Sequence, residues 1–118
     1  MSQRKELSFT NGVPELMVLR LLAEREMYGY ELVSEIRRSS AEVIEFGEGC
    51  IYPILHSLEK KGLLLSRRLE KDGRSRVYYR LNAGGRSRLR EVTAHWQRLS
   101  QAINGVLGGS DAGAAARS

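Results

Sequence analysis

An Asp-Gly pair at residues 72 and 73 restricts the fold more than any other feature of the sequence. Asp-Gly is one of the strongest short signals for a tight hairpin turn, and here it separates two segments enriched in strand-forming residues. In RVYYRL (76–81), Val77, Tyr79 and Leu81 alternate with the other three residues. We therefore expect a two-stranded antiparallel hairpin with one apolar face and one basic face.

The sequence before the hairpin has helical periodicity. Residues 13–26 carry a proline at a first-turn position and then a stripe of leucines, which predicts a mostly buried first helix. Residues 27–40 place glycine and aliphatic residues on one helical face and most charged residues elsewhere, which predicts an amphipathic second helix.

Two residue types bound a short third helix. Pro53 lacks an N–H, so it is tolerated only in about the first turn and the helix is expected to begin near Gly49 or Cys50. Gly62 follows two lysines, which suit the negative end of a helix, and glycine commonly terminates one.

A final helix is predicted over residues 83–107, with Asn82 as its cap. Its apolar residues recur at spacings of three and four, as in a short coiled-coil seam: Leu89, Val92, Trp96, Leu99, Ile103 and Val106. A narrow stripe at the end of a small domain is most simply buried against a second copy, so we expect a homodimer. Residues 108–118 are small, polar and glycine-rich, which predicts a disordered tail.

Composition excludes several classes of protein. The 118 residues suffice for one domain, and no apolar run approaches a membrane span or the core of a secretion signal, so a cytoplasmic protein is expected. With Cys50, His56 and His95 as the only cysteine and histidines, neither a metal site nor another cofactor is expected. The net charge of +5 is concentrated between Ser66 and Leu81, which favours a polyanionic partner.

Three helices, a basic hairpin and a trailing helix form the order of a winged helix-turn-helix, a mainly α (α+β) fold. We expect a DNA-binding domain over residues 1–82, a dimerisation helix over 83–107 and the tail beyond it. In such folds the third helix enters the major groove, and the hairpin, or wing, lies along the backbone or minor groove. A helical wheel centred on Ile51 places four residues opposite the core: Tyr52, Pro53, His56 and Lys60.

Three stretches carry a resemblance to a known family: MYGYEL (27–32), GCIYPILHSLEKKGLL (49–64) and GRSRVYYRLNAGG (73–85). Together they resemble the PadR family of bacterial transcriptional regulators, over about residues 16–85. The resemblance implies a dimeric winged helix repressor whose trailing helix mediates dimerisation, often released by a small molecule or another signal. The single C-terminal helix is similar to that of the smaller members. Cys50 departs from the usual serine or threonine, and NAGGR from a threonine-led helix start.

The candidate DNA contacts come from the second helix, the third helix and the wing. They are Tyr30, Gly49, Cys50, Tyr52, Pro53, His56, Lys60, Lys71, Gly73, Arg74 and Arg76. The alternatives are core packing for Tyr30, the end of the loop for Gly49, cover of the helix surface for Tyr52 and helix-start geometry for Pro53. For His56, Lys60 and the wing cations the alternative is solvated surface. Of Tyr78 and Tyr79, one is expected to pack on the core. Arg4 and Lys5 are either an N-terminal arm or a flexible tail.

The dimer and effector candidates are Leu89, Val92, Trp96, Leu99 and Ile103. Two copies of Trp96 would offer planar surfaces to a small aromatic or hydrophobic effector, or would simply pack as interface anchors. Cys50 is either an oxidant-sensing thiol at a helix N-terminus or a small residue near DNA.

The leading hypothesis is a homodimeric repressor that binds palindromic, double-stranded operator DNA and so associates with the nucleoid, without a membrane partner. The alternative is a winged helix module for protein–protein contacts, in which the basic hairpin is only a solvated surface. The sequence contains no constellation typical of enzymes.

Overall fold

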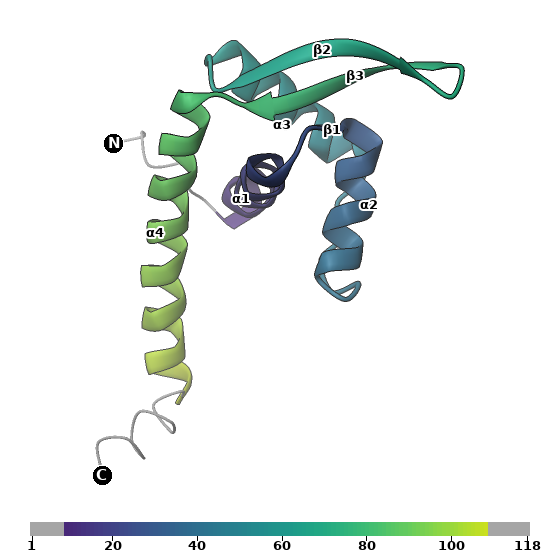
Figure 1. The fold of residues 1–118 in the computed structure, drawn as a ribbon. Coiled ribbons are helices and arrows are strands. Elements are labelled where there is room, and N and C mark those ends of the chain that lie inside the picture. The colour runs from purple at the N-terminus through teal and green to yellow at the C-terminus, as the bar shows by residue number, and fades with distance from the viewer. Residues whose placement is uncertain (1–8, 109–118) are drawn as a thin grey trace.

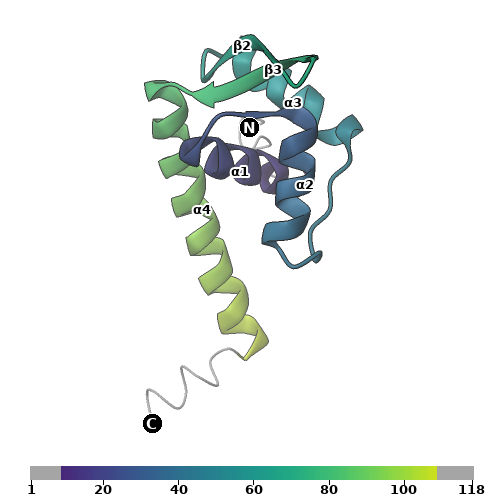
Figure 2. The ribbon, with the colours of Figure 1, turned by 45° about the vertical axis from the view of Figure 1, so that its right-hand side comes forward.

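The computed structural model describes residues 9–108. Its elements are α1 (Phe9–Glu24), β1 (Met27–Tyr28), α2 (Gly29–Ser39), α3 (Glu48–Lys60), β2 (Leu64–Lys71), β3 (Arg74–Leu81) and α4 (Ala83–Leu107). α1 and α2 lie beneath the sheet, α3 lies behind it, and α4 runs from the sheet past α1 and away from α2 (Figures 1 and 2). This is the predicted winged helix architecture. The expectations for Arg4, Lys5 and residues 109–118 lie outside the described residues.

The hairpin forms as predicted. Asp72 and Gly73 both have positive φ, 53° and 75°, as the two central residues of a type I′ turn require. From this turn β2 and β3 pair antiparallel in continuous register, from Lys71 opposite Arg74 to Leu64 opposite Leu81.

The third strand was not predicted. Met27 and Tyr28 were assigned to the second helix, but they pair with Tyr79 and Tyr78 as β1, which gives the sheet order β1-β3-β2. Tyr28 has extended φ and ψ of −96° and 167°, so α2 begins only at Gly29. Two residues are too few to show a strand period, and their pairing partners lie 52 and 50 positions away in the sequence.

α3 begins at Glu48, just before the expected start. Pro53 is therefore its sixth residue and lies in the second turn, so the carbonyl of Gly49 accepts no helical hydrogen bond from position 53. The predicted C-terminal glycine is confirmed, because α3 ends at Lys60 and Gly62 has a left-handed φ of 79°.

The core takes buried residues from every element. Its buried members are Val18, Leu19, Leu22, Met27, Leu32, Ile36, Ile51, Leu55, Leu58, Leu64, Tyr79, Leu81 and Val92. The predicted core face of α3 is thus confirmed, and it holds the opposite side of that helix outward.

Asn82 joins the end of α3 to the start of α4. Its side-chain oxygen accepts from the Gly85 N–H at 2.8 Å, which confirms the predicted cap, and its side-chain amide donates to the Gly62 carbonyl at 2.7 Å. Gly85 is fully packed here, since a Cβ on it would overlap the Leu63 carbonyl oxygen. Further along, Arg88 of α4 forms two hydrogen bonds with Glu15 of α1, at 2.8 and 3.3 Å. The start of α4 is therefore fixed to the body of the domain.

Candidate nucleic-acid interface

The outward side of α3 presents fewer free side chains than the wheel predicted. Pro53, His56 and Lys60 are exposed, as expected for contacts with a ligand. The side chain of Tyr52 is half-buried, because its ring packs against Gly29, the first residue of α2. A Cβ at position 29 would clash with this ring. A wheel treats the helix in isolation, so it placed Tyr52 opposite the core and missed this contact. The His56 ring lies next to that of Tyr52, with centroids 6.2 Å apart.

The first turn of α3 carries Gly49, which is exposed, and Cys50, which is half-buried. The first-turn N–H groups of a helix attract anions, so the position of Gly49 suits a phosphate, whereas the Cys50 N–H already donates to the Gly47 carbonyl at 3.0 Å. Across from them, Tyr30 in the first turn of α2 is 54% exposed, so core packing is not its role. The three residues flank the outward side of α3.

The register of the hairpin separates its cations by face, because directly opposed residues of an antiparallel pair lie on one side of the sheet. The outer face, turned away from the core, carries Arg67, Lys71, Arg74, Arg76 and Arg80. The core-side face carries Arg68 opposite Val77. The predicted basic face is thus present, and one arginine of the wing lies on the other side.

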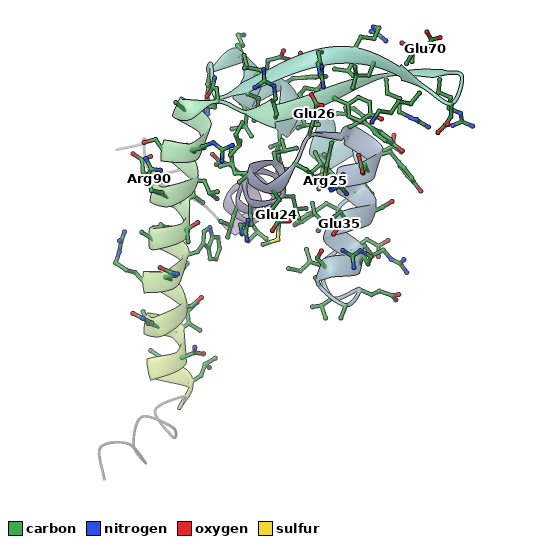
Figure 3. The ribbon with its side chains drawn as sticks, viewed as in Figure 1. Glu24, Arg25, Glu26, Glu35, Glu70 and Arg90 are labelled. Carbon is green, nitrogen blue, oxygen red and sulfur yellow. The ribbon has the colours of Figure 1, made fainter. Side chains whose placement is uncertain are left out.

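Several outer-face cations already have partners. Arg67 donates to both carboxylate oxygens of Glu26 at 2.8 Å, and this hydrogen bond lowers the pKa of Glu26, which is labelled in Figure 3. Lys71 and Arg76 lie over the rings of Tyr78 and Tyr28, 5.0 and 4.4 Å from the centroids.

Arg74 and Gly73 lie exposed at the turn. No ion pair involving Arg74 occurs among residues 9–108. Within the wing candidates, Arg74 is therefore the cation that is free to meet a phosphate.

Both tyrosines of β3 are buried, although only one was expected to be. Tyr79 faces the core at 4% exposure, and its burial raises its pKa. Tyr78 points to the outer face yet is 6% exposed, because Tyr28 of β1 packs edge-on against it, 5.2 Å between centroids, and Lys71 lies over its ring. The unpredicted strand β1 explains the difference, since it supplies the covering ring.

A recess of about 490 Å³ lies between the start of α2, α3 and the hairpin. It brings together four predicted residues, Tyr30, Tyr52, His56 and Arg76, with two that were not predicted as contacts, Arg68 and Ser75. The sequence alone could have indicated both residues. Counting from the Asp-Gly turn places residue 68 opposite Val77 and residue 70 opposite Ser75, on the face of the hairpin that is turned towards α3.

The predicted dimer and effector residues divide into two groups along α4. Val92 is fully buried in its own chain, and Leu89 and Trp96 pack against the same core, so the assignment of Val92 to a surface for a partner is corrected. The heptad spacing cannot distinguish a stripe that faces α1 from one that faces a second copy. Leu99 is half-buried, and Ile103 is 38% exposed.

Beyond Ile103, Val106 and Leu107 are 86% and 75% exposed. A groove of about 550 Å³ lies where α4 leaves α1, lined by Leu16, Trp96 and neighbouring polar residues of α4. The outer side of α4 is polar by contrast, and Arg90 projects from it away from the body of the protein (Figure 3). The exposed apolar surface of α4 is therefore confined to its last two turns and the groove above them.

Two other kinds of site are absent from the part of the chain that the structure describes. No helix between residues 9 and 108 is long and apolar enough to cross a membrane. In the same range no three histidine, cysteine, aspartate or glutamate side chains gather as metal ligands would.

Residues 18–91 match the model of the transcriptional regulator PadR-like family. The chain is 34% identical over 97 residues to the transcriptional regulator Rv3488 of Mycobacterium tuberculosis, covering 82% of this chain and 88% of that protein. Its structure is similar to that of a PadR family transcriptional regulator from Eggerthella lenta, with a TM-score of 0.72, 32% identity and coverage of 88% and 89%. A PadR family transcription regulator from Clostridium difficile R20291 gives a TM-score of 0.69, 28% identity and coverage of 80% and 98%.

Proposed function

Because this chain belongs to the PadR-like family of transcriptional regulators, a family of DNA-binding regulators rather than enzymes, we propose that it is a homodimeric repressor of palindromic operator DNA. The observation that carries the proposal is the placement of the outward side of α3 beside an arginine-rich hairpin on one side of the domain (Figure 2).

In this proposal α3 enters the major groove. His56 and Pro53 are exposed at its centre and meet base edges, the proline ring facing a thymine methyl group. Tyr52 presents only the part of its ring that Gly29 leaves uncovered. Gly49, Cys50 and Lys60, at the two ends of the helix, face phosphates.

The wing adds sequence-independent affinity. Arg74 and the backbone of Gly73 reach the minor groove or its phosphates from the tip of the hairpin, while Lys71 and Arg76 are directed by the aromatic rings beneath them. Tyr30, exposed at the start of α2, donates a hydrogen bond from its hydroxyl to a phosphate of the DNA backbone. Such contacts fix the orientation of the domain so that α3 reads one register.

The homodimer forms through the distal part of α4. Ile103, Val106 and Leu107 are apolar and exposed, and burying them against a second copy removes this surface from water. The two α3 helices then address half-sites about one helical turn apart, roughly 34 Å.

A small aromatic or hydrophobic effector would enter the groove of about 550 Å³ beside Trp96, a volume suited to a small molecule. Since the groove lies where α4 leaves α1, its occupant would shift the distal half of α4 and hence the spacing of the two domains.

The test is a binding assay of the full chain on the duplex upstream of its own gene, against random duplex of equal length. We expect preferential binding of one inverted repeat, protection of two half-sites in a footprint, and affinity that falls steeply with salt. Equal affinity for both duplexes at every salt concentration, or none for either, would overturn the proposal and favour a protein–protein module. Substitution of His56 by alanine should alter the preferred sequence, whereas Arg74→Ala should weaken binding to all sequences.

A further inference from the structure

The recess between α3 and the hairpin exists because β1 is short. β1 pairs only with Tyr78 and Tyr79, so among the described residues the edge of β3 opposite β2 is left without a strand partner at residues 74–77. The chain turns into α2 at Gly29, and the hairpin continues beyond it over α3 (Figures 1 and 2). The residues that line the recess come from five elements, β1, α2, α3, β2 and β3.

The charged residues that line the recess are cations. Arg68 and Arg76 contribute to it, and none of the described residues that line it is acidic. Tyr30, Tyr52 and His56 add polar groups on aromatic rings along the opposite wall. A concave surface with cations and hydrogen-bond donors but no carboxylate favours an anion.

Arg68 is directed into this recess and differs from its neighbour in the sequence. Its Nη1 donates to the hydroxyl of Ser75 at 3.3 Å across the hairpin, which orients the guanidinium and leaves its other donors unused. Arg67, one position earlier, points to the outer face and is paired with Glu26. Among residues 9–108 no carboxylate forms an ion pair with Arg68.

The geometry of a DNA duplex determines which part of the DNA lies at the recess. If α3 occupies the major groove and the hairpin reaches the adjacent minor groove, the sugar-phosphate strand that separates the two grooves lies between α3 and the hairpin. From this we infer that the recess seats one phosphate of that strand, held by the guanidinium of Arg68 with Ser75 as its support. Arg68 is thus a positioning contact, outside the DNA contacts assigned above, and the inference rests on the proposed function.

A phosphate seat at this place sets the depth at which α3 enters the groove. Arginine suits the role because its planar guanidinium binds two phosphate oxygens at once, and the bond to Ser75 holds that plane before DNA arrives. The contact carries no base information itself, so its loss is expected to weaken binding to every sequence by the same factor.

The test compares Arg68→Gln with Arg80→Gln, which removes the same charge from the outer face of the same hairpin. Arg68→Gln should weaken binding about tenfold on both preferred and random duplex, as loss of a charge-assisted hydrogen bond does. It should also reduce the slope of log affinity against log salt by about 0.9. Arg80→Gln should change affinity about twofold or less, because Arg80 points to the face opposite Arg68 and lies six residues from Arg74 along β3, roughly 20 Å, which exceeds the Debye length. Both side chains are exposed, so neither variant should alter the melting temperature.

A second measurement locates the phosphate. In the preferred duplex, phosphates are replaced one at a time by neutral methylphosphonates. The wild-type chain should lose affinity at one position per half-site, between the major groove read by α3 and the adjacent minor groove, and Arg68→Gln should show no further loss at that position. If both chains lose affinity equally at every position, or if the two arginine variants behave alike, the phosphate seat is wrong although the proposed function stands. If the wild-type chain prefers no duplex, the proposed function itself fails.

Discussion

The two halves of α4 belong to different environments although one apolar stripe runs through both. In the first half Val92 is fully buried against the core, Gly85 touches the α3–β2 junction, and Arg88 is bonded to Glu15. In the second half Val106 and Leu107 are almost wholly exposed. A regular heptad spacing therefore says that a helix has a partner along its length, but not that the partner is the same one throughout.

The strongest way to break the first half is to place a charge in it. Val92→Asp buries a carboxylate with no partner at a fully covered position, so we expect the domain to lose its cooperative fold at neutral pH. Circular dichroism and thermal melting would show this. A variant that melts like the wild-type chain would mean that Val92 is not enclosed.

The same change in the second half should leave the fold intact and alter the assembly. Val106→Asp adds a charge to a residue that is 86% exposed in the single chain, so each domain should keep its secondary structure. If α4 is the dimer interface, sedimentation should show monomers in place of dimers, and affinity for an inverted repeat should fall towards that for one half-site. Dimers that persist in Val106→Asp would place the interface elsewhere.

Substitutions of glycine by alanine in the two halves of α4 should change stability by smaller amounts. Gly85→Ala should destabilise the domain by about 2 kcal/mol, because its Cβ would overlap the Leu63 carbonyl oxygen and lie 2.9 Å from Cδ2 of Leu81, and backbone must move to relieve this. The free energy of unfolding in urea measures the effect. An unchanged free energy would show that the α3–β2 junction yields without cost.

The smallest effect is expected at Gly105, in the distal half. No atom within 4 Å would meet a Cβ there, so Gly105→Ala should stabilise α4 by about 0.5–1 kcal/mol through helix propensity. Helix content and melting temperature should rise slightly. A loss of stability that depends on protein concentration would instead indicate that a second copy approaches α4 at Gly105.

What could be predicted depended on whether the signal was local. The Asp72-Gly73 turn, the Asn82 cap and the glycine after α3 are local backbone requirements, and all three hold in the structure. The strand at Met27 was missed because its pairing with Tyr79 is distant in sequence, and the burial of Tyr78 was missed with it.

In the candidate site, the side chains of α3 were placed correctly where solvent faces them, at Pro53 and His56. Tyr52 was not, because its environment depends on a glycine in another helix. Arg68 was counted among the basic residues of the hairpin but not assigned to a face, although the turn alone fixes its register. Hydrophobic periodicity describes one element at a time, so it does not predict contacts between elements that are distant in the sequence.

Asn82 has one further consequence. Because one side-chain amide bonds both the Gly62 carbonyl, just after α3, and the first turn of α4, a change in the angle between the two helices would strain these hydrogen bonds. In the proposed dimer α3 and the first half of α4 would therefore move as one rigid unit. To fit a different operator spacing, the distance between the two α3 helices would then have to be adjusted at the exposed last turns of α4, where the proposal places the second copy.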